Sequence, residues 1–373
     1  MPKTMHALSV PIVTVGLFCA GLLAAAELRA ELSPPLRVQV MAKELERPWA
    51  FAFLPDGRVL ITERAGQLRV WQDGKLLAEP VKGMPEVYDE GQGGLLDVQV
   101  DADFERNKTI YFSYAYRDGE GNHTRVERAM LDRNALQART VLFTSSPGKG
   151  TSVHYGGRLL MLPGRELLLG LGDGFDYREA AQDLRSDLGK VISIQADGSA
   201  NQGRELAKIY SLGHRNVQGL VYSSRENWVY AHEHGPQGGD EINRLQRGGN
   251  YGWPLLSYGL DYTGARVTPL AELPDRPDLL APVLHWTPSI APSGMAIYEG
   301  SLFPDWQGDL LVSTLVGREL RRVKLRDGKV LQQESLLKER DQRWRDIRVA
   351  ADGSVWLLSD GEQAELLRIT PKS

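Results

Sequence analysis

The sequence predicts an all-β chain of repeated antiparallel strands, as in a β-propeller. The first reason is a recurring unit in which a glycine-containing turn precedes a short apolar strand. The second is that 39 glycines and 20 prolines are spread through the 373 residues, which is typical of many turns between short strands. The third is a weak helical signal, because the best helical candidate, 178–188, is short. The recurring units occupy residues 55–62, 163–171, 308–314 and 352–358.

Strands are predicted in order from the first apolar runs that follow the N-terminal segment. Near the other end of the chain, Leu366–Thr370 is also strand-like. We expect Leu36–Val40 and Leu366–Thr370 to pair within one blade, because closing the ring removes two exposed sheet edges. The early runs are separated by turns and indicate a meander: Leu36–Val40, Ala50–Leu54, Val59–Thr62 and Leu68–Trp71.

One catalytic domain is predicted for residues 36–372, since nothing in this range demands a separate α/β domain. The recurring units are unevenly spaced, because insertions such as Asp118–His123 and Leu260–Ala281 lengthen particular connections. Long loops on a rigid scaffold usually carry function. We therefore expect long loops on the active-site face of the propeller.

Residues 1–26 are predicted to be an export signal. Lys3 precedes an apolar run at 7–26 that contains no Asp, Glu, Lys or Arg and ends in three alanines, which form an A-x-A cleavage site. Cleavage is expected after Ala26, or as late as Ala30. If it stayed uncleaved, a run of this length would also be long enough to span a bilayer. The expected location is therefore periplasmic or secreted, without stable membrane insertion after cleavage.

Charge and cysteine content exclude several classes of function. The formal net charge of −4 gives no basic surface for nucleic acid. The single cysteine, Cys19, falls within the apolar run, so the rest of the chain offers no disulfide, thiolate metal site or Cys-x-x-Cys-His haem attachment. The sequence leaves the oligomeric state open between a monomer and a homodimer.

The segment 232–254 is rich in glycine and in oxygen donors. Gly235 and Pro236 prevent a continuous helix or central strand, so the backbone turns and exposes carbonyls near the carboxylate of Glu241. Calcium prefers carbonyl and carboxylate oxygens of this kind. A zinc site built on the two histidines of the segment is the alternative, but no third nitrogen or thiolate ligand is identifiable.

Three further residues are candidates for contact with a ligand. His154 lies where an irregular segment enters an apolar strand, and a neutral imidazole there can act as a general base. Taken alone, a hydrogen-bonded structural histidine is the more common case. Gln92 lies in a glycine-rich turn, where a solvated amide is the alternative. Trp286 can stack on a planar ligand, although large aromatic side chains more often belong to a core.

A pair of arginines is predicted to bind an anion. Arg343 and Arg345 flank Trp344 at a predicted strand end, so both guanidiniums project to one side and the indole to the other. Two convergent arginines suit a polycarboxylate. Local pairing with Asp341 and Asp346 is the alternative, and the residues alone do not decide between the two.

Three longer segments, 210–219, 232–243 and 250–254, resemble the soluble aldose sugar dehydrogenases, which are relatives of soluble quinoprotein glucose dehydrogenase. The resemblance implies a six-bladed propeller that uses pyrroloquinoline quinone (PQQ) and calcium. It extends along most of the mature chain through shorter matches at 47–50, 91–97, 286–294 and 343–346.

The resemblance also implies roles for individual residues. In catalysis, His154 removes the proton of the anomeric hydroxyl, and Arg215 together with calcium stabilises the new oxyanion. The implied PQQ-binding residues are Gln92, Arg215, Asn216, Arg343 and Arg345, and Trp286 is the candidate for stacking on the cofactor. The implied calcium ligands are the carbonyls at Gly235 and Pro236 and, at a nearby second site, Glu241, the Tyr251 carbonyl and Asp261.

One position departs from the pattern of the glucose dehydrogenase branch. That branch has a cofactor-binding lysine where this chain has Val316, directly after Leu315. We expect Arg318, two residues on, to supply the missing charge. The departure puts the affinity for PQQ in doubt more than its identity.

The activity implied by the resemblance is oxidation of the anomeric carbon of aldoses to lactones, with hydride passing to the quinone and electrons then passing to an external acceptor. Two alternatives stay open. A calcium-dependent propeller lactonase would share the carboxylate-rich loops but would not need a cluster of arginines. A non-catalytic carbohydrate-binding propeller would not need His154.

Overall fold

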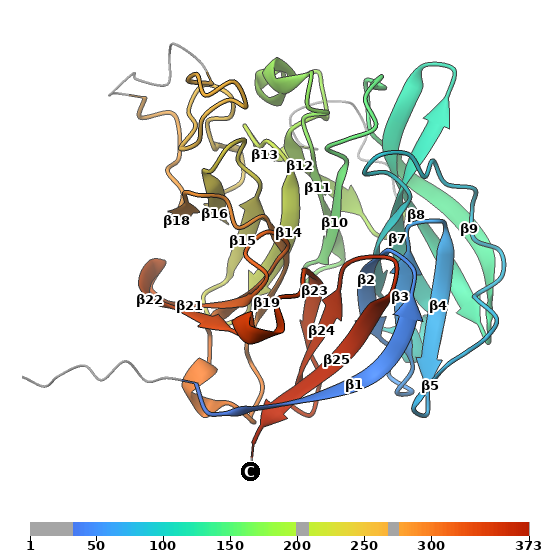
Figure 1. Cartoon of the computed structure of the whole chain (residues 1–373). Coiled ribbons are helices and arrows are strands. Elements are labelled where there is room, and N and C mark those ends of the chain that lie inside the picture. Colours follow the sequence, from blue (N-terminus) through green and yellow to red (C-terminus); the bar gives the residue numbers. More distant parts are fainter. Residues whose placement is uncertain (1–32, 199–208, 268–275, 373) are drawn as a thin grey trace, which may run out of the picture. The chain divides into compact units, whose positions relative to one another are not determined.

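The computed structural model describes residues 33–198, 209–267 and 276–372. The predicted export signal, with Cys19 and both predicted cleavage sites, lies outside these described residues. The described residues form six β-sheets arranged as a six-bladed β-propeller (Figure 1). Each sheet is antiparallel, apart from one short parallel pairing between β13 and β17 in the third. The predicted fold class is therefore confirmed.

The blades follow one another along the chain. Blade one contains β2 (Pro48–Phe53), β3 (Val59–Glu63), β4 (Gln67–Gln72) and β5 (Lys75–Leu76). Blade two contains β6 (Leu95–Val100), β7 (Thr109–Asp118), β8 (Gly121–Asp132) and β9 (Ala135–Thr144). Blade three contains β10 (Gly156–Met161), β11 (Glu166–Leu171), β12 (Lys190–Gln195), β13 (Ile209–Leu212) and β17 (Gly249–Asn250).

The second half of the chain supplies the other three blades. Blade four contains β14 (Val217–Ser223), β15 (Trp228–Glu233), β16 (Asp240–Leu245) and β18 (Leu284–Trp286). Blade five contains β19 (Pro292–Ile297), β20 (Leu310–Thr314), β21 (Leu320–Arg326) and β22 (Lys329–Leu336). Blade six contains β23 (Trp344–Val349), β24 (Val355–Ser359), β25 (Ala364–Pro371) and, from the other end of the chain, β1 (Leu36–Leu45).

The ring is closed by pairing of the first strand with the last. The first strand of each blade contacts the first strand of the next, and β23 contacts β2. In blade six, β1 pairs antiparallel with β25, from Leu36 opposite Pro371 to Leu45 opposite Ala364, as Figure 1 shows for the blue and red strands. The predicted pairing of these two segments is thus observed. The facing edges of β1 and β25 are hydrogen-bonded to each other, so neither of these two edges is left unpaired.

The hydrophobic core is divided among the six contacts between neighbouring blades, one cluster of buried residues in each. Between blades six and one, for example, Leu45 and Leu366 pack with Phe51 and Ile61. Because side chains alternate along a strand, each middle strand presents apolar residues to both neighbouring blades. Each fully buried leucine or phenylalanine contributes about 1.5–3 kcal/mol.

A buried charge network joins the inner strands of three blades. Arg158 on β10 lies 3.4 Å from Asp97 on β6 and 3.1 Å from Asp346 on β23, measured from its Nη1. Arg348, also on β23, lies 3.3 Å from Asp97 and 3.4 Å from Asp346. Both carboxylates are fully buried. The network therefore fixes the inner strands to one another with paired rather than isolated charges.

Two predicted elements differ from the structure. The helix expected at 178–188 is the short 3₁₀ helix η1 (Arg178–Gln182), followed by turns. The insertion at Asp118–His123 is the tip of the long β7–β8 hairpin rather than a loop, because pairing continues to Asp118 opposite Gly121. The other helices in the part of the chain that the structure describes are also short: α1 (Phe104–Asn107), η4 (Pro304–Trp306) and η5 (Lys338–Arg340). None of the helices in the described ranges has the length and apolar character needed to cross a bilayer.

Candidate functional site

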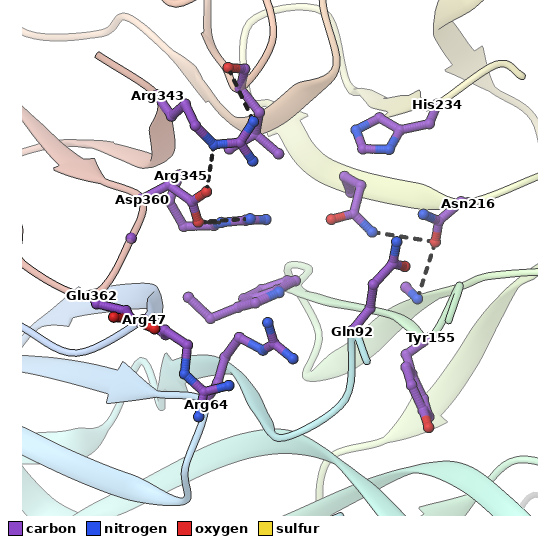
Figure 2. A pocket seen from close by; sticks show the side chains of 15 residues that line it. Arg47, Arg64, Gln92, Tyr155, Asn216, His234, Arg343, Arg345, Asp360 and Glu362 are labelled. Carbon is purple, nitrogen blue, oxygen red and sulfur yellow. Dashed lines mark hydrogen bonds and ion pairs between the residues drawn. The ribbon is translucent and has the colours of Figure 1, made fainter. Parts of the chain in front are cut away.

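A cavity of about 390 Å³ lies at the end of the ring where the first strand of each blade begins and the second ends (Figure 2). All six blades contribute to its lining, because the chain returns to this end in every blade. Most lining residues lie just before a first strand or just after a second strand. They include Arg47, Arg64, Gln92, Tyr155, Gly156, Asn216, His234, Leu315, Arg343, Arg345, Asp360 and Glu362.

Arg343 and Arg345 line one side of the cavity together. Alternation at the start of β23 directs both guanidiniums into the cavity and buries Trp344 in the core, as the sequence indicates. Their common partner is Asp360, which lies 2.8 Å from Arg343 Nε and 2.8 Å from an Nη of Arg345. Burial alone would raise the pKa of Asp360, but Arg345 and Arg343 lower it below its usual value. The expected alternative partners, Asp341 and Asp346, bind other arginines.

A second arginine pair lines the same cavity. Arg47 lies 2.5 Å from Asp89, and Arg64 lies 3.7 Å from the same carboxylate. Arg64 also donates from Nε to the Gly93 carbonyl at 2.8 Å and from Nη2 to the Gly91 carbonyl at 2.5 Å. Figure 2 shows both pairs on one side of the cavity, facing Gln92, Asn216 and His234 on the other.

Polar side chains form the opposite side of the cavity. The side-chain amide oxygen of Gln92 accepts a hydrogen bond from the backbone N–H of His154 at 2.9 Å. Asn216 is buried, and its Oδ1 accepts the N–H of Gly156 at 3.2 Å. His234 Nε2 donates to the carbonyl of Pro292 at 2.7 Å, and burial lowers the pKa of His234 to about 4. This side therefore offers neutral donors and acceptors.

His154 is held by an aspartate that the sequence did not single out. Its Nδ1 lies 2.7 Å from Asp173 Oδ1, so the N–H donates there and Nε2 is left with its lone pair. Nε2 makes no hydrogen bond to another residue that the structure describes. Burial lowers the pKa of His154, the bond to Asp173 raises it, and the charge of Arg215 lowers it, so the imidazole is neutral at pH 7. A neutral imidazole with a free Nε2 can accept a proton.

The backbone around His154 is strained. Its φ of 51° lies in the left-handed region, which costs a non-glycine residue about 1 kcal/mol or more. Gly172, next to Asp173, permits this approach, since a Cβ there would lie 2.1 Å from the His154 carbonyl. The residues around the imidazole therefore fix its position closely.

Arg215 lies behind the cavity rather than in its lining. Its Nη1 donates to the carbonyls of His234 at 3.1 Å and Gly235 at 2.7 Å, and its Nη2 to the Tyr262 hydroxyl at 3.2 Å. Its carbonyl accepts the backbone N–H of Asp173 at 2.8 Å. Arg215 therefore joins the loop after β15 to the residues that orient His154.

The donors around Glu241 fit a hard cation. Glu233 and Glu241 lie opposite each other on β15 and β16, both buried, and the Asn243 amide donates to one oxygen of each, at 3.0 and 3.1 Å. Burial and the neighbouring Glu233 carboxylate raise the pKa of Glu241 well above its usual value. A divalent cation beside Glu241 would relieve this repulsion.

Other predicted calcium ligands are not gathered in this way. The Gly235 carbonyl accepts from Arg215, and Pro236 is buried beside it. The Tyr251 side chain is buried and stacks on His214 at 5.1 Å, whereas Asp261 lies 3.5 Å from Arg178 on the surface. Among the described residues, no group of three or more His, Cys, Asp or Glu side chains is arranged to hold a metal ion.

Besides Arg215, two predicted cofactor contacts lie outside the cavity lining. Trp286 is packed in the core between blades four and five, and its Nε1 donates to Gln333 at 2.7 Å. Arg318 is half exposed and lies 3.0 Å from Asp341, and the Val316 side chain points to solvent. These placements argue against a stacking role for Trp286 and against Arg318 as the source of charge.

Two of the four residues that the sequence interpretation missed carried some signal in the sequence. Arg47 begins one of the shorter matched segments, and Asp173 lies between two glycines directly after an apolar strand. Arg64 and Asp89 carried no local signal, because their role depends on contacts with other parts of the ring.

Comparison with known proteins agrees with this geometry. Residues 45–368 match the family model described as glucose/sorbosone dehydrogenase. The chain is 37% identical over 349 residues to the aldose sugar dehydrogenase YliI of Escherichia coli (strain K12), covering 91% of this chain and 94% of that protein.

Two solved structures extend the comparison to the fold. The soluble aldose sugar dehydrogenase from Escherichia coli in the apo-form has a TM-score of 0.85 at 37% identity, covering 91% of this chain and 100% of that one. The PQQ-bound form of the aldose sugar dehydrogenase from Streptomyces coelicolor has a TM-score of 0.71 at 25% identity, covering 90% of this chain and 100% of that one.

Proposed function

We propose that this chain, which belongs to the glucose/sorbosone dehydrogenase family, oxidises the anomeric carbon of an aldose to a lactone with PQQ bound in the cavity. The observation that carries the proposal is the cavity itself. Four guanidiniums line it next to neutral amide groups, a donor set that suits a flat molecule with several carboxylates. A lactonase would have no use for such a cluster.

Arg343 and Arg345 would hold carboxylates of PQQ, and Gln92 and Asn216 would donate to its other oxygens from the facing side. When bound, PQQ supplies a quinone that accepts hydride from the anomeric carbon. The chain's own contribution is to fix the positions of these donors in advance, so that they need not reorganise during the reaction.

His154 acts as the general base in this proposal. Asp173 fixes its tautomer, so that Nε2 accepts the proton of the anomeric hydroxyl. Arg215 contributes a nearby positive charge that favours developing negative charge.

An apolar surface lies beside the proposed base. The exposed ring of Phe175 meets the His154 ring edge-on at 5.2 Å and stacks on Tyr262 at 6.0 Å. Aromatic faces of this kind suit the apolar face of a sugar.

Calcium is proposed beside Glu241, with the Tyr251 carbonyl as a further ligand and Asp261 as a weaker candidate. The Gly235 and Pro236 carbonyls are proposed for a second ion. The support is the raised pKa of Glu241 next to Glu233 and the oxygen donors of this segment.

The remaining parts of the proposal concern partners and location. The single cysteine lies at position 19 and no haem-attachment motif is present in the sequence, so an external acceptor must collect the electrons. The predicted export signal at 1–26 places the mature protein in the periplasm or outside the cell.

Reconstitution tests the proposal. Purified protein is supplied with PQQ and calcium, and reduction of a dye is followed with several aldoses. We expect turnover that requires PQQ, and we expect His154→Ala to lower kcat by roughly 10²–10⁴-fold, the usual contribution of a general base, while PQQ binding is retained.

Lys43→Ala is the control, because Lys43 is exposed on β1 and lies 3.5 Å from Glu365, to which no role is assigned here. Its turnover should equal that of the wild type. Hydrolysis of lactones without PQQ would favour the lactonase instead, and sugar binding without turnover would favour a binding protein.

A further inference from the structure

The two arginine pairs of the cavity have the same construction. In each pair, two guanidiniums share one carboxylate: Arg343 and Arg345 share Asp360, and Arg47 and Arg64 share Asp89. A carboxylate neutralises only one of two guanidiniums, so each group retains positive charge toward the cavity.

The positive charge of the cavity is not fully balanced. The residues that line the cavity include four arginines and two carboxylates, Asp360 and Glu362. Burial lowers the pKa of Arg64, Asp89 raises it, and the charges of Arg47 and Arg345 lower it further. The two groups therefore repel each other along one side of the cavity, and an anion that contacts both would relieve this repulsion.

Arg64 also keeps donors available. Its Nε and Nη2 donate to the Gly93 and Gly91 carbonyls, and its Nη1 makes no hydrogen bond to another described residue. These two carbonyls belong to the glycine-rich turn that carries Gln92. Arg64 therefore fixes the position of the neutral Gln92 amide in addition to presenting its own charged guanidinium.

Ring closure holds Arg47 in place. Its φ of 44° is unusual for a residue with a side chain. The backbone N–H of Arg47 donates to the Gly361 carbonyl in blade six at 2.8 Å, and its carbonyl accepts the N–H of Arg64 at 3.1 Å. The side chain is thus fixed at the point where blades six and one meet.

We propose that Arg47 and Arg64, held by Asp89, form a second carboxylate-binding group that grips one end of the bound polyanion while Arg343 and Arg345 grip another. The inference rests on the proposed function, because it takes the polyanion to be PQQ. In this proposal Arg47 and Arg64 also supply the positive charge that was expected from Arg318, because Arg318 lies outside the lining and is paired with Asp341.

Equilibrium binding of PQQ tests the inference without any turnover. Quenching of tryptophan fluorescence is followed on calcium-saturated protein, with PQQ and with its trimethyl ester. In the ester, all three carboxylates are replaced by uncharged ester groups. We expect Arg47→Met to weaken PQQ binding about tenfold, the usual scale for one charge-assisted contact, and to leave binding of the ester unchanged. Arg318→Met is the control and should bind both as the wild type does.

Asp89→Asn separates a ligand-binding role from a structural one. If Asp89 only builds a salt bridge, Asp89→Asn and Arg47→Met should weaken PQQ binding alike. If the group binds the ligand, Asp89→Asn should preserve or strengthen PQQ binding at low salt, because it frees positive charge. Circular dichroism melts establish that each variant is folded, and Arg47→Gln replaces Arg47→Met if the latter is not.

The two proposals fail in different ways. If the wild type binds PQQ and Arg47→Met binds PQQ with the same affinity, this inference is overturned and the proposed function is left intact. Absence of PQQ binding by the wild type would overturn the proposed function, and this inference with it.

Discussion

One neighbour sets the tautomer of His154, and several neighbours fix its position. Asp173 accepts from Nδ1, while Oδ2 of the same carboxylate accepts the Trp253 indole N–H at 2.8 Å. Gln92 holds the backbone N–H of His154 from a turn in another blade. An imidazole fixed on this many sides loses little entropy on meeting a substrate, which is one source of catalytic rate.

Asp173→Asn should therefore impair turnover more than substrate binding. The amide cannot fix the same tautomer, and we expect kcat to fall by about 100-fold, the scale of a misplaced catalytic group. Asp173 raises the pKa of His154, and burial already holds that pKa below its usual value of 6.5. Since His154 must be neutral to act, the acidic limb of the pH–rate profile should lie below pH 6.5 in the wild type and move to still lower pH in Asp173→Asn. A limb that moved upward would contradict the assignment of His154 as the base.

The loop between β9 and β10 carries His154 and is anchored by a buried lysine. Lys149 Nζ donates to the carbonyls of Thr151 at 2.7 Å and Val153 at 2.8 Å, and it lies 3.5 Å from the centre of the Tyr155 ring. Lys149 is almost fully buried. Burial lowers its pKa to about 7, against a smaller raising effect of Asp173.

Lys149→Met should change how stability depends on pH. The lysine has a pKa of about 7 when folded and an ordinary value of 10.5, so between these values the unfolded chain binds more protons. Stability of the wild type should thus gain about 1.4 kcal/mol per pH unit from this residue as pH rises from about 7 to 10, and the methionine variant should lack that rise. Urea unfolding across this range measures the difference. Lys43→Met, at an exposed site, should follow the wild type.

Elements were predicted from the sequence better than their contacts. Short apolar runs indicated the strands at 36–40 and 366–370, and alternation along a strand indicated the common direction of Arg343 and Arg345, because these features depend on local geometry. Arg64 and Asp89 escaped notice, since their meeting depends on how separate turns are brought together in the ring. The sequence left Trp286 open between a ligand contact and the core, because residue type alone does not distinguish a core aromatic residue from one in a site.

At the scale of the whole molecule, the charge network around Arg158 joins blades two, three and six through their inner strands. The side chain of Arg158 also covers the ring of Trp49 in blade one, 4.3 Å from its centre. Its Nε also donates to the carbonyl of Gln218 in blade four at 2.8 Å. A single guanidinium thereby contacts five of the six blades, counting its own.

Arg158→Met should destabilise the protein by about 3–5 kcal/mol, because it leaves Asp97 and Asp346 buried with only Arg348 to balance them. Guanidinium chloride unfolding measures the loss. Asp97→Asn in the same chain should recover part of it by removing one unbalanced charge. Arg106→Met, which breaks an exposed pairing with Asp103, should cost less than about 1 kcal/mol. Equal losses in the two single variants would contradict the importance of the network.

The pairing of Leu36 with Pro371 joins an early and a late segment of the sequence. A nascent chain on the ribosome can assemble several blades in succession, but β1 has no partner strand until β25 emerges. The ring therefore cannot close before β25 is available for pairing with β1. A chain that ends early, before β25, keeps two unpaired strand edges and is prone to associate with other copies.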